Sequence, residues 1–267
     1  MKIEFLGIPY SGKTFIKNEI AIELKKNKIN TISYKKFFYK EAQINLQLSF
    51  LDKIIMKIMF LKTNDDKQRQ VTKLKIKKKN YIYLRKIFQK KVQNIKEYTY
   101  SQFEKKNHNF SILLKKFFLK NKKNNNTLKR WIIDTCVSQH IYEKRKNNNV
   151  TILDCEGFIH RLNSLMISSK NKNLPESYLK YVPMPHVLIY INEKPKTCRQ
   201  RMKKLNNKED LIKFDNKLEI FHKNTKLIYQ KIKKKCPKIF IIDSKNYDSK
   251  TKKDIVKYIL NKQKNFK

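Results

Sequence analysis

The chain has 267 residues, of which 40% are hydrophobic and 12% aromatic, so it can bury a sizeable core and wholesale disorder is excluded. Lysine and arginine number 64 against 22 aspartates and glutamates, giving a formal net charge of +42. Such a field attracts polyanions, namely nucleic acid, anionic membrane surfaces or phosphorylated metabolites. An AT-rich coding sequence would also enrich lysine, so a functional and a compositional origin of the charge both stay open.

The four cysteines and the distribution of apolar residues bear on the cell compartment. The cysteines form no C-x-x-C pair and have no spacing suited to zinc, so we expect reduced thiols in a cytoplasmic protein. No run of about 18 uncharged apolar residues is present, so no membrane-spanning helix is expected.

Short apolar runs alternate with segments that have helical periodicity. The runs at 3–6, 29–34, 150–154, 187–191 and 239–243 predict five strands, each apolar enough to be covered on both faces. Spacings of three and four predict helices at 14–26, 130–146, 158–169, 195–205, 218–235 and 249–260. This alternation predicts an α/β fold, a three-layer sandwich around a parallel five-stranded sheet.

The segment 35–126 interrupts that alternation. It contains no glycine and no proline, it is rich in lysine and aromatic residues, and it ends in the solvated run 120–126. We interpret it as a basic, mostly helical insertion for acceptor or partner binding, with the core formed by 1–34 and 127–267. Within the insertion, 44–62 predicts an amphipathic helix that is buried or faces a partner, with a membrane-surface helix as the alternative.

Only three glycines occur, at positions 7, 12 and 157. In so glycine-poor a chain, we expect them where the backbone needs positive φ or approaches a ligand closely. Two of them lie in "GIPYSGKT", which fits the phosphate-loop pattern G-x-x-x-x-G-K-[ST] between a predicted strand and a predicted helix. The predicted nucleotide-binding residues are Gly7, Ile8, Pro9, Tyr10, Ser11, Gly12, Lys13 and Thr14.

That pattern assigns specific contacts within the loop. Backbone amides and the helix N-terminus hold the β-phosphate of ATP, Lys13 reaches the β- and γ-oxygens, and Thr14 ligates Mg²⁺. The third glycine lies in "VTILDCEGFIHR", where an apolar strand ends in Asp154. A carboxylate at this place predicts a partner for Mg²⁺, partly through water, and Glu156 predicts a second acid near the transferring phosphoryl group or the acceptor.

Arginine is rare in this chain, with seven residues among 64 cations, so a position that keeps arginine can need its bidentate fork for phosphate. Arg161 stands one helical turn after Gly157, and Arg199 and Arg201 lie on the helix after the fourth strand. We include these three as candidate catalytic residues with Lys13, Asp154 and Glu156. Arg130, at the start of another helix, is an open case.

These motifs together resemble the P-loop nucleoside and nucleotide kinases, over everything except the insertion. The segment "LDCEGFIHR" is similar to a kinase element of acid, glycine, phenylalanine and arginine, which implies that Arg161 contacts an acceptor phosphate. The run "MPHVLIYINEKPKTCRQRMKKL" resembles the strand and helix that lead into the kinase lid, whose arginines clamp the transferring phosphoryl group. The closing "KIFIIDSKNYDSKTKKDIVKYI" resembles the last strand and helix, which flank the nucleotide base.

The resemblance implies in-line transfer of the γ-phosphoryl group from ATP, with Mg²⁺ as cofactor and an acceptor that the sequence does not identify. The insertion falls where these kinases place acceptor-binding helices, which allows an acceptor larger than a nucleotide.

Three other readings stay open. A GTPase is suggested by D-x-x-G at 154–157 and by N-K-x-D at 207–210, although the second pattern follows a basic helix end instead of a buried strand. A sulfotransferase loop resembles "PYSGKT" only loosely. The charge and the aromatic residues of 80–91 also fit an NTPase that binds nucleic acid.

Overall fold

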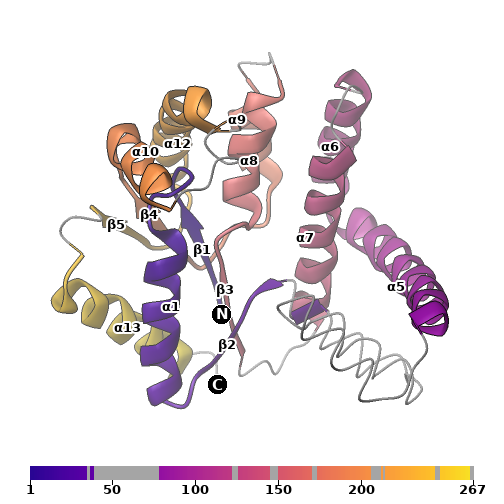
Figure 1. Ribbon diagram of the computed structural model, residues 1–267, viewed down its shortest axis with the longest axis horizontal. Coiled ribbons are helices and arrows are strands. Elements are labelled where there is room, and N and C mark those ends of the chain that lie inside the picture. The colour runs from indigo at the N-terminus through magenta and orange to yellow at the C-terminus, as the bar shows by residue number, and fades with distance from the viewer. Residues whose placement is uncertain are drawn as a thin grey trace.

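The computed structural model describes residues 1–34, 37–38, 78–121, 126–144, 150–169, 173–205, 212, 214–243 and 247–264. Its centre is a five-stranded parallel sheet in the order β2-β3-β1-β4-β5 (Figure 1). The strands are β1 (Lys2–Leu6), β2 (Asn30–Ile32), β3 (Val150–Asp154), β4 (Val187–Ile191) and β5 (Ile239–Ile242). All five predicted strands are confirmed, and the second is shorter because the chain leaves the sheet at Ser33.

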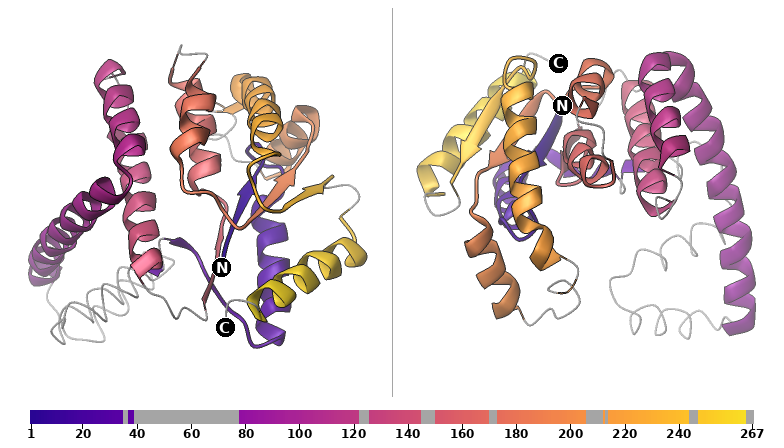
Figure 2. Two further views of the ribbon diagram at one scale, coloured as in Figure 1. Left: turned by 180° about the vertical axis from the view of Figure 1, so that it is seen from behind. Right: turned by 90° about the horizontal axis from the view of Figure 1, so that it is seen from above.

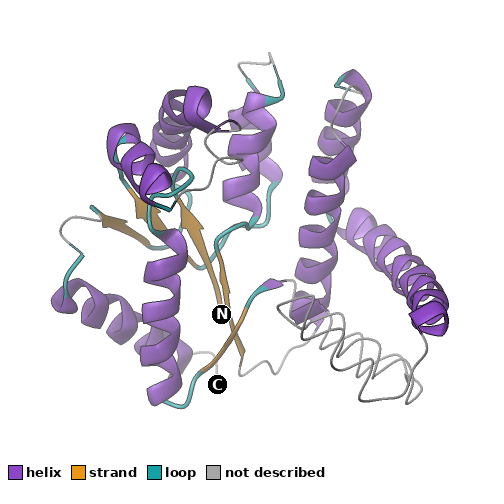
Figure 3. Ribbon diagram, in the orientation of Figure 1, coloured by secondary structure: helices purple, strands orange, loops and turns teal. Residues whose placement is uncertain are grey.

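Helices cover both faces of the sheet and form the predicted three-layer sandwich (Figures 1 and 3). Ile3 and Phe5 of β1 pack towards α1 (Lys13–Lys26) and α13 (Ser249–Lys264). Leu6 belongs to the core of the opposite face, beneath α8 (Phe158–Ile167) and α12 (Leu218–Ile232). Because successive side chains of a strand point to opposite faces, the apolar residues of one strand contribute to both cores.

The other predicted helices are also present, with shifted ends. The segment predicted at 195–205 forms α10 (Pro195–Lys204), and that at 130–146 forms α7 (Asn126–Lys144). α6 ends at Lys120 and α7 begins at Asn126, so both ends of the run 120–126 are helical, and both of these residues are exposed. The structure adds α9 (Leu174–Tyr181) and the 3₁₀ turn η1 (Asp215–Lys217). Both are too short for a periodic apolar pattern to reveal them.

The insertion is helical wherever the structure describes it. It forms α5 (Lys78–Lys106) and α6 (His108–Lys120), which we group with α7 as the helical arm. Residues 39–77, which include the amphipathic helix predicted at 44–62, lie outside the described residues. Among the helices that are described, none has the length and apolarity needed to cross a bilayer.

The helical arm lies beside α8 and α9 of the core (Figure 2), and aromatic side chains join the two. The Phe103 ring of α5 stacks on Phe158 of α8 with centroids 6.4 Å apart, and Phe110 of α6 meets Tyr178 of α9 edge-on at 5.1 Å. All four rings belong to one buried cluster. The arm therefore shares a hydrophobic core with the sheet.

Two charged residues are buried inside β1. Lys2 is 1% exposed, and its Nζ donates hydrogen bonds to Gln139 Oε1 at 3.1 Å and to the Pro183 carbonyl at 3.0 Å. Burial lowers the pKa of Lys2 to about 8, against the attraction of Glu4. Glu4 is fully buried, and its Oε2 accepts the backbone N–H of Ile159 at 2.9 Å. Glu4 thus satisfies an amide in the first turn of α8, where a negative charge is favourable.

Candidate functional site

The phosphate loop joins the end of β1 to the start of α1, as the sequence predicts. Gly7 is required because an added Cβ would lie 2.7 Å from Ser11 Oγ and 3.2 Å from the Ile191 carbonyl oxygen. Gly12 is required for a different reason, since its φ of +95° is rarely adopted by residues with a side chain. The loop also closes on itself through a hydrogen bond from the Ser11 amide to the Ile8 carbonyl, 3.2 Å.

Tyr10 is the second residue of the loop with a left-handed backbone, at φ 61°. Positive φ at Tyr10 and Gly12, separated by Ser11, is the alternation that directs successive backbone amides to one side and makes an anion-binding nest. A free-energy cost of about 1–2 kcal/mol is expected at Tyr10, because its Cβ crowds the following carbonyl. The loop keeps this shape at a position where glycine would carry no such cost.

Lys13 folds back over the loop that precedes it. Its Nζ donates hydrogen bonds to the carbonyl oxygens of Gly7, at 2.8 Å, and Ile8, at 2.7 Å. Burial lowers the pKa of Lys13 to about 8, while Cys155, Cys198 and Glu156 act in the opposite direction. The cation therefore stands at the loop mouth, held by neutral acceptors that phosphate oxygens can replace.

A cavity of about 820 Å³ opens beside the loop, between the sheet and the helical arm. Four predicted site residues line it, namely Thr14, Asp154, Glu156 and Arg161. They meet because β3 pairs in parallel with β1, which brings the carboxyl ends of both strands to the same edge of the sheet. The two glycine motifs, which are more than 130 residues apart in sequence, thus both contribute side chains to one cavity.

Asp154 is fixed by two backbone amides. Its Oδ2 accepts the N–H of Tyr34 at 2.8 Å, and its Oδ1 accepts the N–H of Glu156 at 2.7 Å. Burial raises the pKa of Asp154, and the two hydrogen bonds oppose that shift. Each carboxylate oxygen has lone pairs left, and Thr14 presents an exposed hydroxyl to the same cavity. Hydroxyl and carboxylate oxygens are the donor set that suits Mg²⁺.

Arg161 lies between an acid and an aromatic ring. Its Nη2 donates to Glu156 Oε2 at 2.6 Å, and its guanidinium carbon lies 4.7 Å from the centroid of the Trp131 ring. The Arg161 side chain is 8% exposed, whereas that of Glu156 is 63% exposed. The structure therefore joins two predicted site residues in one pair and adds Trp131, the only tryptophan of the chain.

Gly157 is explained by a contact that the sequence did not indicate. Its φ of −70° is ordinary, but an added Cβ would lie 2.2 Å from Glu4 Cδ. The close approach expected of this glycine is made to the buried Glu4 carboxylate, and no ligand is needed to account for it. An acid within an apolar strand of an acid-poor chain was the signal that could have identified Glu4.

The two arginines predicted to belong to a lid, Arg199 and Arg201, are not among the residues that line the cavity. Arg199 of α10 pairs with Asp215 of η1 and with Glu219 of α12, at 2.9 Å for the second pair. Arg201 donates from Nη1 to the Tyr10 carbonyl at 3.2 Å and pairs through Nη2 with Glu193 at 3.0 Å. Arg201 is thus adjacent to the phosphate loop, whereas Arg199 is engaged by the acids of the next helix. Arg130, the open case, lines the cavity.

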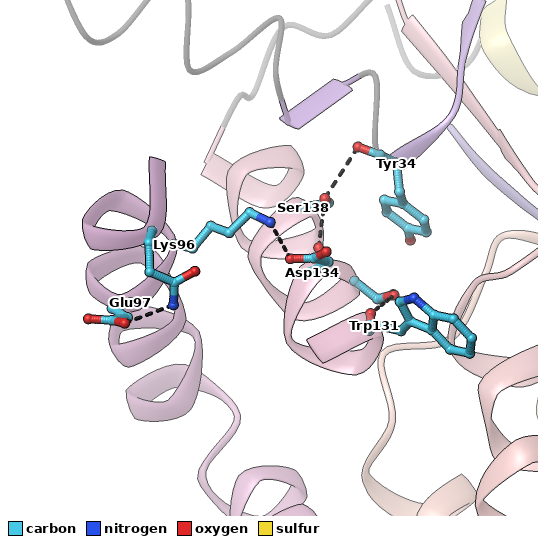
Figure 4. A network of polar contacts seen from close by, with 8 residues as sticks. Tyr34, Lys96, Glu97, Trp131, Asp134 and Ser138 are labelled. Carbon is cyan, nitrogen blue, oxygen red and sulfur yellow. Dashed lines mark hydrogen bonds and ion pairs between the residues drawn. The ribbon is translucent and has the colours of Figure 1, made fainter. Parts of the chain in front are cut away.

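The helical arm supplies cavity residues that the sequence did not predict. Lys96 of α5 pairs with Asp134 of α7 at 2.6 Å, and Ser138 Oγ donates to the Asp134 and Tyr34 carbonyls at 2.8 and 3.3 Å (Figure 4). All four line the cavity. The local sequence around these residues carries no motif that would identify them. They come together only because the arm packs against the end of β2.

Only one of the two patterns that suggested a GTPase lies within the described residues. Residues 154–157 follow β3 as D-x-x-G requires, while 207–210 lie outside the described residues. The strand that precedes a guanine-reading motif in such folds corresponds to β4, which ends at Ile191 and is followed by "NEKP".

Comparison with solved structures finds similarity to deoxyadenosine kinase from M. mycoides. The structure with the products dCMP and a flexible dCDP bound is 14% identical to this chain, with a TM-score of 0.44. The complexes with dCTP and with dATP are each 15% identical, with TM-scores of 0.41 and 0.44. Each match covers 98% of this chain and 100% of the other. These neighbours are nucleoside kinases, the class that the sequence motifs resemble. No family model and no curated protein matches the chain.

Proposed function

We propose that this protein is an ATP- and Mg²⁺-dependent phosphotransferase of the P-loop small-molecule kinase type. The observation that carries the proposal is the shared cavity. Thr14, the last residue of the phosphate loop, lines the same cavity as Asp154 and Glu156, and Lys13 directly precedes it in the chain. A phosphate loop by itself supports only phosphate binding. The two acids and Arg161 in the same cavity wall support the further step of phosphoryl transfer.

The nucleotide half of the proposed site consists of the loop, Lys13 and Thr14. The backbone N–H groups of Gly12 and Lys13 and the N-terminus of α1 receive the β-phosphate, and Lys13 Nζ moves from the Gly7 and Ile8 carbonyls to phosphate oxygens. Thr14 and Asp154 would hold Mg²⁺, which neutralises charge on the phosphates.

The acceptor half of the proposed site is the part of the cavity that lies between the core and the helical arm. Trp131 offers an aromatic surface, and amide, hydroxyl and charged groups from α5 and α7 surround it. This lining fits a polar acceptor with a ring, and the volume of about 820 Å³ admits one larger than a single ring. We assign to Glu156 and Asp154 the role of orienting or deprotonating an acceptor hydroxyl, and to Arg161 that of neutralising charge there.

The reaction we propose is in-line displacement on the γ-phosphorus. The acceptor oxygen forms the new P–O bond, the bond to the bridging oxygen of ADP breaks, and the acceptor proton leaves to a carboxylate or water. Such transfer depends on positioning and charge neutralisation more than on covalent catalysis. Asp154 is already held in place by two backbone N–H groups, and Lys13 supplies the charge once its Nζ exchanges the loop carbonyls for phosphate oxygens.

The test is phosphoryl transfer from labelled ATP to a panel of nucleosides, nucleoside monophosphates, sugars and metabolite extracts, with MgATP binding measured by calorimetry. Lys13→Ala should lower MgATP affinity and transfer by roughly a hundredfold or more, because the cation at the β- and γ-phosphates is lost.

The matched control is Lys25→Ala, which removes an exposed lysine from the other end of α1. It should bind and react as wild type does. Transfer that survives Lys13→Ala would refute the site, and a preference for GTP over ATP beyond about tenfold would refute the ATP-dependent kinase.

A further inference from the structure

The contact between α10 and the phosphate loop has no part in the scheme above. It starts at Tyr10, the only residue of the described loop with both a side chain and a left-handed backbone. Comparable loops need a residue that tolerates positive φ, and glycine does so without crowding. Tyrosine does not, so a loop with tyrosine here tends to leave the nest conformation unless neighbouring groups hold it.

Two kinds of contact hold Tyr10 in place. Arg201 Nη1 donates a hydrogen bond to its carbonyl oxygen at 3.2 Å. The Tyr10 side chain packs against a small apolar cluster of Ile8, Cys198, Met202, Leu218 and Phe221, which connects the loop to α10 and α12. The carbonyl contact acts on the backbone itself, where the unfavourable torsion lies.

Arg201 is itself anchored by a buried acid. Its Nη2 pairs at 3.0 Å with Oε2 of Glu193, whose side chain is 2% exposed. The other carboxylate oxygen of Glu193 accepts the N–H of Lys194 at 3.0 Å, just after β4. An acid buried this deeply needs its cation, because an unpaired buried charge is costly. The guanidinium of Arg201 is therefore held through Nη2 by Glu193, just after β4, and through Nη1 by the phosphate loop.

We propose that Arg201 is a positioning residue, which holds the phosphate loop in its anion-binding shape through the carbonyl of Tyr10 and thereby couples α10 to nucleotide affinity. This role differs from the clamp on the transferring phosphoryl group that the sequence resemblance implied for Arg201. The planar fork of arginine suits this role, since one terminal nitrogen serves a carboxylate and the other a carbonyl. For its effect on nucleotide affinity the inference rests on the proposed function.

The test compares Arg201→Leu in three backgrounds: wild type, Tyr10→Gly and Tyr10→Ala. Glycine removes the backbone strain, whereas alanine removes the aromatic ring and keeps the strain, so the two separate backbone from side-chain effects. We measure MgATP affinity by calorimetry, and amide hydrogen exchange of the peptide spanning 7–14 in the ligand-free protein.

Arg201→Leu should weaken MgATP binding about tenfold and speed loop exchange in the wild-type and Tyr10→Ala backgrounds. In the Tyr10→Gly background both effects should shrink to within about twofold, because the loop no longer needs the contact. Lys203→Leu removes the same charge from an exposed position of α10 and serves as the control.

Equal effects of Arg201→Leu in the wild-type and Tyr10→Gly backgrounds would overturn the inference and place Arg201 on the phosphates or the fold. So would unchanged loop exchange in Arg201→Leu. If the wild type does not bind MgATP, the proposed function fails, and loop exchange in the ligand-free protein still decides the role of Arg201.

Discussion

At the scale of single residues, Gly157 is needed because there is no room for a side chain, and not because of its backbone torsions. Its backbone is ordinary, yet Glu4 occupies the space where a side chain would begin. Gly157→Ala must therefore displace a buried carboxylate that holds the first turn of α8. We expect a loss of about 1–3 kcal/mol in the free energy of unfolding, measured by urea denaturation.

Ser168→Ala serves as the control for that substitution. It changes the other end of α8, at the C-cap, and places no atom against Glu4. Its free energy of unfolding should stay close to that of wild type. A Gly157→Ala protein as stable as this control would show that Glu4 has another position available.

The lowered pKa of Lys13 leads to a second prediction, about proton uptake when the nucleotide binds. Burial gives the ligand-free protein a Lys13 pKa of about 8, below the ordinary 10.5, so above pH 8 much of the population carries a neutral amine. Phosphate oxygens favour the ammonium and raise its pKa, so nucleotide binding above pH 8 must take up a proton. Calorimetry in buffers of different ionisation enthalpy should show this uptake near pH 8.5 and almost none near pH 6.5.

The proton uptake should disappear in Lys13→Met, which keeps the length of the side chain and removes the titrating group. Uptake that persists in this variant would assign the proton to another group. An uptake equally large at pH 6.5 would contradict the lowered pKa of Lys13.

At the scale of elements, the pairing of α5 with α7 determines one wall of the cavity. Lys96→Met removes the ion pair with Asp134 and the contact of Nζ with the Phe38 ring, 5.4 Å from its centroid. Because Asp134 is 42% exposed, only about 0.5–1 kcal/mol of local stability should be lost. Amide exchange in α5 around position 96 should quicken, while exchange in β1 and β4 stays unchanged.

Lys105→Met, at an exposed position near the end of the same helix, provides the comparison. If both variants speed exchange in α5 equally, the Lys96–Asp134 pair does not hold the arm. Faster exchange throughout the sheet would mean that arm and core unfold as one cooperative unit.

The elements also show where sequence reasoning succeeds. The strands and most helices follow from local apolar patterns, and the phosphate loop from a pattern in which every specified residue has a local task. The left-handed Tyr10 stands at an unspecified position of that pattern, so its conformation was not readable. The Glu4–Gly157 and Arg201–Tyr10 contacts join residues more than 150 positions apart, and only the packing of strands and helices brings them together.

At the scale of the whole molecule, acids are scarce and many serve in pairs. Glu156, Glu193 and Asp215, for example, each pair with an arginine, and 22 acids are too few to match 64 lysines and arginines, which leaves the net charge of +42. A nucleotide approaching the loop therefore meets a positive field that salt screens.

This field predicts a strong salt dependence of nucleotide binding. MgATP affinity should fall by about tenfold between low ionic strength and about 0.5 M salt, because the Debye length shrinks to a few ångströms. The affinity of an uncharged acceptor should change far less, and comparing the two by calorimetry separates the field from general destabilisation. Equal salt dependence of both ligands would contradict this account. Filter binding of nucleic acid over the same salt range tests the remaining alternative, which a flat and weak response would remove.

Trp131 offers a practical route to the acceptor. As the sole indole of the chain, half-exposed in the cavity wall and resting on the Arg161 cation, it accounts for all tryptophan emission of the protein. A molecule that enters this space alters the polarity around the indole or separates it from the cation, and either change shifts or quenches the signal. Candidate acceptors can therefore be screened optically, with no label and no turnover, and the wild-type protein itself is the sensor.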